Sequence, residues 1–97
     1  MEKVSKPKVK TLAAGTNFVS KQMAANEGEL LPKHSANIES IMFIHEGECI
    51  LNLGGQDNHL KPGDAIIVPP NVPHQFKAIT DFRGVHFMPK DIQFEFF

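Results

Sequence analysis

The sequence predicts an all-β protein, a sandwich or barrel built from short strands. About nine or ten apolar or alternating stretches follow one another at close spacing. Clusters of glycine, proline and asparagine, which favour turns, separate these stretches. No long segment has the period of ~3.6 residues that an amphipathic helix needs. Together these observations favour strands over helices along the whole chain.

The composition limits the classes of function. The 97 residues are expected to form one domain, residues 1–97, that buries roughly two-thirds of the unfolded surface. Ten basic against eleven acidic residues argue against nucleic-acid binding. No apolar run reaches the ~18 residues of a membrane span, and the N-terminus lacks the apolar core of a signal peptide. Because Cys49 is the one cysteine, no intramolecular disulfide can form, and we expect a cytoplasmic protein.

The first part of the chain predicts edge strands. Residues 1–10 are rich in lysine and are expected to be flexible or to form an edge strand over residues 8–12. Gly15 ends this stretch, and residues 17–25 predict the next strand, with Lys21 exposed to solvent. A turn follows, and Pro32 favours an extended path into His34.

The middle of the chain predicts the main strands. Residues 38–46 form the strongest one, in which residues 41–44 are apolar on both faces, so we expect something to cover the outer face as well. Residues 49–53 and 56–60 follow as two strands. The Gly54-Gly55 pair between them suits a two-residue hairpin loop.

Residues 63–74 combine a turn, a strand and a rigid loop that presents one histidine. Gly63 follows a proline in a turn. Residues 65–68 form an apolar, β-branched run that is typical of a strand covered on both faces. Three prolines between residues 69 and 73 exclude a helix and give the loop a fixed shape. We therefore expect this loop to set the position of His74.

The last part of the chain predicts three more strands. Residues 75–80 and 82–88 form two of them, divided near Asp81. Residues 91–97 are expected to contain a C-terminal strand over residues 92–96, in which Ile92, Phe94 and Phe96 make one apolar face.

The spacing of several residues resembles the two motifs of the cupins, small barrels of two β-sheets whose motifs surround a metal. The residues at the motif spacings are Gly28, His34, Gly47, Gly63, Pro69 and His74. Asn71 replaces a motif glycine, which is tolerable because asparagine enters the left-handed region readily. The resemblance covers about residues 15–90. It implies a single jelly-roll barrel, a double-stranded β-helix of the RmlC-like type.

The resemblance also implies a depleted metal site. The four ligands of the family, three histidines and a glutamate, fall on His34, Ala36, Ser40 and His74. Alanine has no donor atom and a neutral serine hydroxyl is a poor ligand, whereas a catalytic zinc-type site normally has three protein ligands. His34 and His74 are therefore the candidate metal ligands that remain.

A third ligand would come from His86, His45 or Glu39. Glu39 is one residue out of register and faces away unless a β-bulge returns it. The alternation that turns Ser40 inward turns His45 outward. His86 is the better candidate, because cupins line the cavity with its strand, but the sequence leaves its facing open.

The resemblance implies a ligand pocket inside the barrel. Its expected lining residues are His34, Ser40, Met42, His74, Phe76 and His86. We expect His59 at the surface and Cys49 as a small buried side chain without reactivity.

These residues favour a non-enzymatic cupin whose cavity binds a small polar molecule, with weak or absent metal binding. In the alternative, a metal-dependent dioxygenase, isomerase or decarboxylase holds Zn, Fe, Mn or Ni with His34, His74 and a displaced third ligand. A metal-free isomerase with His74 as general base is the least favoured option, because no inward carboxylate accompanies it. The sequence leaves open whether the protein is an enzyme.

We also expect a homodimer. The apolar strand at residues 41–44 and the apolar C-terminal stripe offer more apolar surface than one thin domain covers, and large exposed apolar patches mark interfaces.

Overall fold

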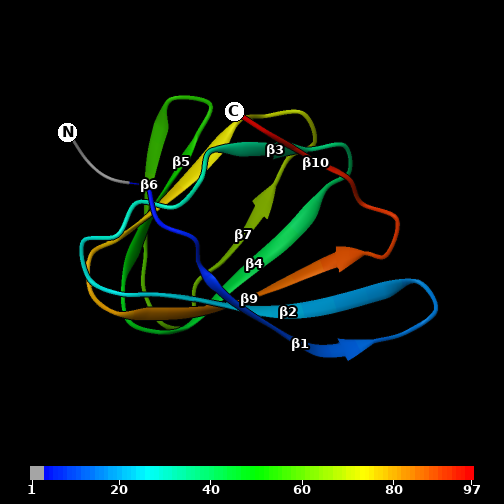
Figure 1. The fold of residues 1–97 in the computed structure, drawn as a ribbon, viewed down its shortest axis with the longest axis horizontal. Coiled ribbons are helices and arrows are strands. Elements are labelled where there is room, and N and C mark those ends of the chain that lie inside the picture. Colours follow the sequence, from blue (N-terminus) through cyan, green and yellow to red (C-terminus); the bar gives the residue numbers. More distant parts are fainter. Residues whose placement is uncertain (1–3) are drawn as a thin grey trace.

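The computed structural model describes residues 4–97 and contains two five-stranded antiparallel sheets, with no helix among these residues (Figure 1). One sheet has the order β1-β2-β9-β4-β7 and the other β10-β3-β8-β5-β6. The strands are β1 (Lys8–Ala14), β2 (Phe18–Ala25), β3 (His34–Ala36), β4 (Ser40–Glu46), β5 (Cys49–Leu53), β6 (Gln56–Leu60), β7 (Ala65–Val68), β8 (His74–Ala78), β9 (Phe82–Pro89) and β10 (Phe94–Phe96). The predicted all-β fold is confirmed.

The strand boundaries differ from the predictions mainly at the two ends of the chain. The expectation for residues 1–10 extends to residues 1–3, which lie outside the described residues. β1 is two residues longer than the predicted edge strand, and β10 starts at Phe94 rather than at residue 92. β3 was expected only as extended chain. It becomes a strand because β10 pairs with it along its whole length. Within residues 4–97 no helix is long and apolar enough to cross a membrane.

The core lies between the two sheets. Met42 and Ile44 from β4, Leu51 from β5 and Phe76 from β8 are almost fully buried. The Phe76 ring stacks against Phe82 with centroids 6.1 Å apart. Ser40, Met42 and Ile44 are 3%, 1% and 0% exposed, so all three face inward, as predicted for Ser40 and Met42. The alternation along β4 thus decides which side chains meet the opposite sheet.

The loop that leads to β8 has the predicted backbone. Asn71 has φ of 64°, in the left-handed region, where the cupin motif has glycine. Its backbone N–H donates to the Ala36 carbonyl over 2.7 Å. Asparagine tolerates this conformation better than most residues. The bond ties the loop to β3, which carries His34.

The outer face of the β1-β2-β9-β4-β7 sheet is exposed within the chain. Ile41, Ile67 and Phe87 lie opposite one another on three adjacent strands and are 42%, 48% and 44% exposed. The prediction that residues 41–44 and 65–68 are covered on both faces is therefore wrong for the single chain, because no other element of residues 4–97 packs over β4 and the edge strand β7. The homodimer stays a prediction. Light scattering after size-exclusion chromatography tests it, and a monomer at micromolar concentration would contradict it.

Gly47 gives a test of the turn between β4 and β5. Its φ is +71°, and a Cβ there would overlap the Asp81 carbonyl oxygen and backbone of Phe82. We predict that Gly47→Ala lowers the free energy of unfolding by about 3 kcal/mol or more, since strain and overlap add. Thermal unfolding followed by circular dichroism measures this.

Gly28→Ala is the matched control. Its φ is +82°, but a Cβ would meet nothing within 4 Å. The expected loss is therefore the strain alone, roughly 1–2 kcal/mol. Equal losses in the two variants would contradict the role of close packing at Gly47.

Candidate functional site

The pair of His34 and His74 lies where the short strand β3 meets β8. The two residues are the one registered pair between these strands, and their rings are edge to face with centroids 4.3 Å apart. Nδ1 of His34 lies 3.0 Å from the Pro32 carbonyl oxygen, and Nδ1 of His74 lies 3.1 Å from that of Val72. A carbonyl only accepts, so each Nδ1 carries the proton and donates it. Nε2 of each ring keeps its lone pair.

His86 faces the same interior from the other sheet. It lies on β9, directly opposite Met42 of β4 and Lys21 of β2. Its Nε2 lies 2.7 Å from Oγ of Ser40. The question of its facing, open at the sequence level, is thereby settled as inward.

The three histidines are neutral near pH 7. Burial lowers the pKa of His86 to about 4, and repulsion from His74 and His34 adds to this. Burial also lowers the pKa of His34 and of His74, although the hydrogen bond to a carbonyl opposes the shift in each. At neutral pH these rings are therefore hydrogen-bonding groups rather than cations.

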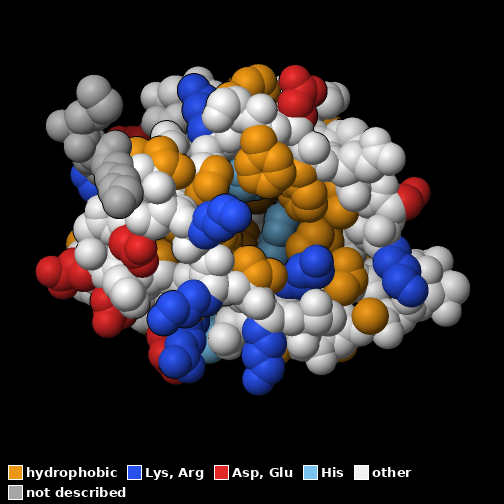
Figure 2. Space-filling view, viewed as in Figure 1, with side chains coloured by type: hydrophobic (Ala, Val, Ile, Leu, Met, Phe, Trp, Pro, Cys, Tyr) orange, Lys and Arg blue, Asp and Glu red, His pale blue; other side chains and the backbone are white. Residues whose placement is uncertain are grey.

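A cavity of about 540 Å³ opens beside these rings between the two sheets. His34 and His86 are its polar wall groups, and Lys6 and Lys21 also line it. Its other walls are apolar, mostly Met, Phe, Val, Leu and Pro side chains. Figure 2 shows this hollow, with hydrophobic side chains around it, a histidine visible inside and basic side chains at the rim. The arrangement is a mostly apolar pocket with a few polar groups.

The structure brings only part of the predicted pocket to the cavity surface. His34, Phe76 and His86 line it. His74 is 2% exposed, in contact with the His34 ring, and Ser40 is 3% exposed, behind His86. Met42 belongs to the core cluster. His74 and Ser40 therefore support the residues that line the cavity.

Sequence reasoning missed several residues of the cavity wall, among them Phe94, Phe96 and Lys21. Phe94 and Phe96 on β10 approach His34 with ring centroids at 5.5 and 5.1 Å. Their apolar stripe was predicted, but its position beside His34 depends on the unexpected pairing of β10 with β3. Lys21 was expected in solvent, but it is half-buried and lines the cavity. The sequence did contain a signal for this position of Lys21. It lies two residues from Val19 and two from Met23, so the alternation of the strand places all three side chains on the same, inward face.

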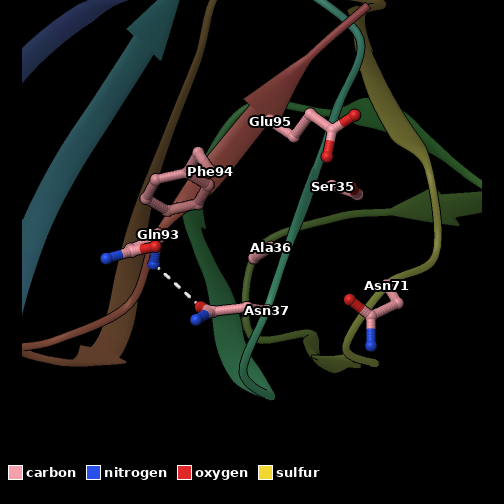
Figure 3. Close-up of a pocket in the computed structure, with 7 residues that line it drawn as sticks. All are labelled: Ser35, Ala36, Asn37, Asn71, Gln93, Phe94 and Glu95. Carbon is pink, nitrogen blue, oxygen red and sulfur yellow. Dashed lines mark hydrogen bonds between the residues drawn. The ribbon is translucent and has the colours of Figure 1, made fainter.

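A second, smaller pocket of about 160 Å³ shows how β10 is attached (Figure 3). The backbone N–H of Gln93 donates to Oδ1 of Asn37 over 2.8 Å, and the Asn37 N–H donates to the Gln93 carbonyl. Its other lining residues are Ser35, Ala36, Asn71, Phe94 and Glu95. These bonds hold β10 on β3 and so keep Phe94 beside His34.

The side chains do not fit a metal site of three protein ligands. Ala36 supplies no donor, and Ser40 is engaged with His86. His45 is turned away from the inward-facing residues of its strand, and Glu39 is exposed. Within residues 4–97 no group of three or more His, Cys, Asp or Glu side chains is arranged to hold a metal ion. Two imidazoles alone fall short of the usual ligand count.

Cys49 lies in the core, as predicted. Burial raises the pKa of its thiol to about 12. The nucleophilic form of cysteine is the thiolate, so this side chain takes no part in the site's chemistry.

His86 makes the folded chain sensitive to acid. Its folded pKa of about 4 lies below the ordinary value of 6.5, so between these values the unfolded chain binds a proton that the folded chain does not. We predict that the free energy of unfolding is highest above this window and falls by up to about 3 kcal/mol as the pH drops through it. Urea unfolding above and inside the window measures the loss.

The histidine variants separate this effect from other titrating groups. His86→Gln should lose less stability on acidification than the parent. His59→Gln is the control for substituting a histidine outside the cavity, because the His59 side chain is 60% exposed. An unchanged acid loss in His86→Gln would refute the assignment.

Comparison with known proteins identifies the family. The family model for a cupin domain matches residues 21–88. The uncharacterized protein MJ1618 of Methanocaldococcus jannaschii is 38% identical over 50 residues, which cover 52% of this chain and 39% of that protein. The chain thus spans well under half the length of this curated relative.

Solved structures show the same fold. A conserved protein of Klebsiella pneumoniae with a double-stranded β-helix domain superposes with a TM-score of 0.84 at 22% identity, over 98% of this chain and 89% of that chain. Salicylate 1,2-dioxygenase from Pseudoaminobacter salicylatoxidans gives 0.86 at 14% identity, over 99% of this chain and 30% of that chain. With the match to the family model over most of its length, this chain belongs to the cupins, and its fold is the double-stranded β-helix of these solved structures.

Proposed function

We propose that this cupin binds a small organic molecule in the cavity between its sheets and does not depend on a tightly held metal ion. The observation that carries this proposal is the cavity of about 540 Å³ with the neutral rings of His34 and His86 in an otherwise apolar wall. Small-molecule pockets commonly measure about 300–1,000 Å³ and combine apolar walls with a few polar groups.

The apolar walls of the cavity restrict the class of ligand further than the sequence did, which suggested a small polar molecule. A small polar molecule forms hydrogen bonds with the histidines but leaves the apolar Phe, Met and Leu side chains of the walls exposed to water. A ligand with an apolar body and one polar end suits both. His34 offers Nε2 as an acceptor, since its Nδ1 donates to Pro32. Binding of this kind needs no nucleophile or general base.

The cytoplasmic location remains our expectation.

Ligand screening by ¹H–¹⁵N NMR tests this function. We predict that hits from a small-molecule library shift the signals of residues around the cavity. His34→Asn and His86→Asn should each weaken such a hit about tenfold, the loss expected when one hydrogen bond is removed. His59→Asn, at an exposed position, is the matched control and should leave the affinity unchanged.

Two results would overturn the proposal. One is a library without any ligand at the cavity. The other is a set of hits whose affinity does not change in His34→Asn and His86→Asn.

The metal-dependent enzyme is a second candidate, favoured by one observation. Both His34 and His74 donate Nδ1–H to a backbone carbonyl, the arrangement that orients metal-binding histidines and frees Nε2. A neighbour with this fold is described as salicylate 1,2-dioxygenase, so the barrel is compatible with catalysis. A bound divalent ion, Zn, Fe, Mn or Ni, would supply Lewis-acid or redox chemistry.

Metal analysis of untagged protein, purified without chelator, separates the two candidates. The ligand-binding function predicts less than stoichiometric metal and no change in content for His34→Ala or His74→Ala. Stoichiometric metal that both variants lose would instead support the enzyme.

A further inference from the structure

We propose that the ligand of the cavity is an amphipathic organic anion, with an apolar body against the Met and Phe walls and one anionic head group, such as a carboxylate, beside Lys21. This inference rests on the proposed function and specifies its ligand class. It starts from a lysine that the sequence placed in solvent and the structure places in the wall of the cavity.

Lys21 points into the space between the sheets. It is on the inward face of β2 with Met23, and it lies directly opposite His86 of β9 in the antiparallel register. Side chains at directly opposed positions are close neighbours, with Cβ atoms ~4.5–5.5 Å apart. The Lys21 side chain therefore lines the cavity next to a polar wall group, His86.

The positive charge in the cavity has no acidic partner among residues 4–97. In the described part of the chain, no ion pair joins Lys21 or Lys6 to a carboxylate. Among residues 4–97, the cavity lining contains these two lysines and no Asp or Glu. The whole chain has a formal net charge of −1, so this positive bias is local to the cavity.

When a ligand fills the cavity, the charge of its head group determines how tightly it binds. An apolar ligand displaces water from the half-buried Lys21, and an ammonium that loses water without a partner costs free energy. An anion replaces the water with a charge-assisted hydrogen bond, which is stronger than a neutral one. A cationic ligand meets both repulsion and desolvation. The same apolar body should therefore bind in the order anion, neutral molecule, cation.

Three probes with one apolar body test this order: octanoate, octan-1-ol and octylamine. Isothermal titration calorimetry suits the protein, which has no tryptophan or tyrosine for fluorescence. We expect octanoate to bind at least tenfold more tightly than octan-1-ol, and octylamine to bind most weakly. Lys21→Met should weaken octanoate about tenfold and leave octan-1-ol unchanged or tighter, whereas Lys21→Arg should retain the preference for the anion.

Lys10→Met is the matched control. Lys10 belongs to the same β1–β2 ribbon, but it is exposed, lies opposite Gln22 and does not line the cavity. Its loss should leave the octanoate affinity unchanged. Circular dichroism of each variant checks that the fold is kept, and Lys21→Arg provides the comparison if Lys21→Met does not fold.

The outcomes separate this inference from the function on which it rests. Octan-1-ol bound as tightly as octanoate, or octanoate affinity unchanged in Lys21→Met, overturns the anionic ligand and leaves ligand binding in place. Equal losses in Lys10→Met and Lys21→Met also overturn it, because the effect would then be general charge attraction. Binding of none of the probes overturns the inference, while the NMR screen decides the proposed function separately.

Discussion

The site depends on one cross-strand contact, the pairing of His34 with His74. β3 has three residues and meets β8 at this pair alone, so the contact fixes where the strand sits over the cavity. Nδ1 of each imidazole is hydrogen-bonded to the backbone carbonyl two residues earlier in the chain. Prolines precede both rings closely and restrict the backbone that supplies these carbonyls. The result is two oriented, neutral rings, one in the cavity wall and one buried behind it.

The residues at two positions that match ligand positions of the family motif have structural roles. Ser40, where the family has glutamate, binds the inward-facing His86 instead of a cation. Ala36 is 3% exposed, and its carbonyl accepts the bond from Asn71 that holds the loop before β8. Both buried polar groups of the Ser40–His86 pair are satisfied within the protein, as buried polar groups generally must be. The Ser40–His86 pair therefore needs no cation, which agrees with the proposal of an organic ligand in the cavity.

Sequence reasoning succeeded where a local rule decides the structure. The period of two along β4 placed Ser40 and Met42 inward, and the left-handed tendency of asparagine explained Asn71. It failed where pairing between distant strands decides. The approach of Phe94 to His34 was missed, and the facing of His86 was left open, because both depend on registers that no local pattern encodes. The exposed outer face of β4 and β7 was missed because an apolar run does not reveal what covers it.

The central claim is that carbonyl groups hold His34 and His74 as adjacent, neutral imidazoles with protonated Nδ1. Long-range ¹H–¹⁵N spectra of the histidine ring nitrogens near pH 7 measure the protonation state and the tautomer directly. The structure predicts that both rings are neutral with the proton on Nδ1. Rings that are charged, or neutral with the proton on Nε2, would contradict it.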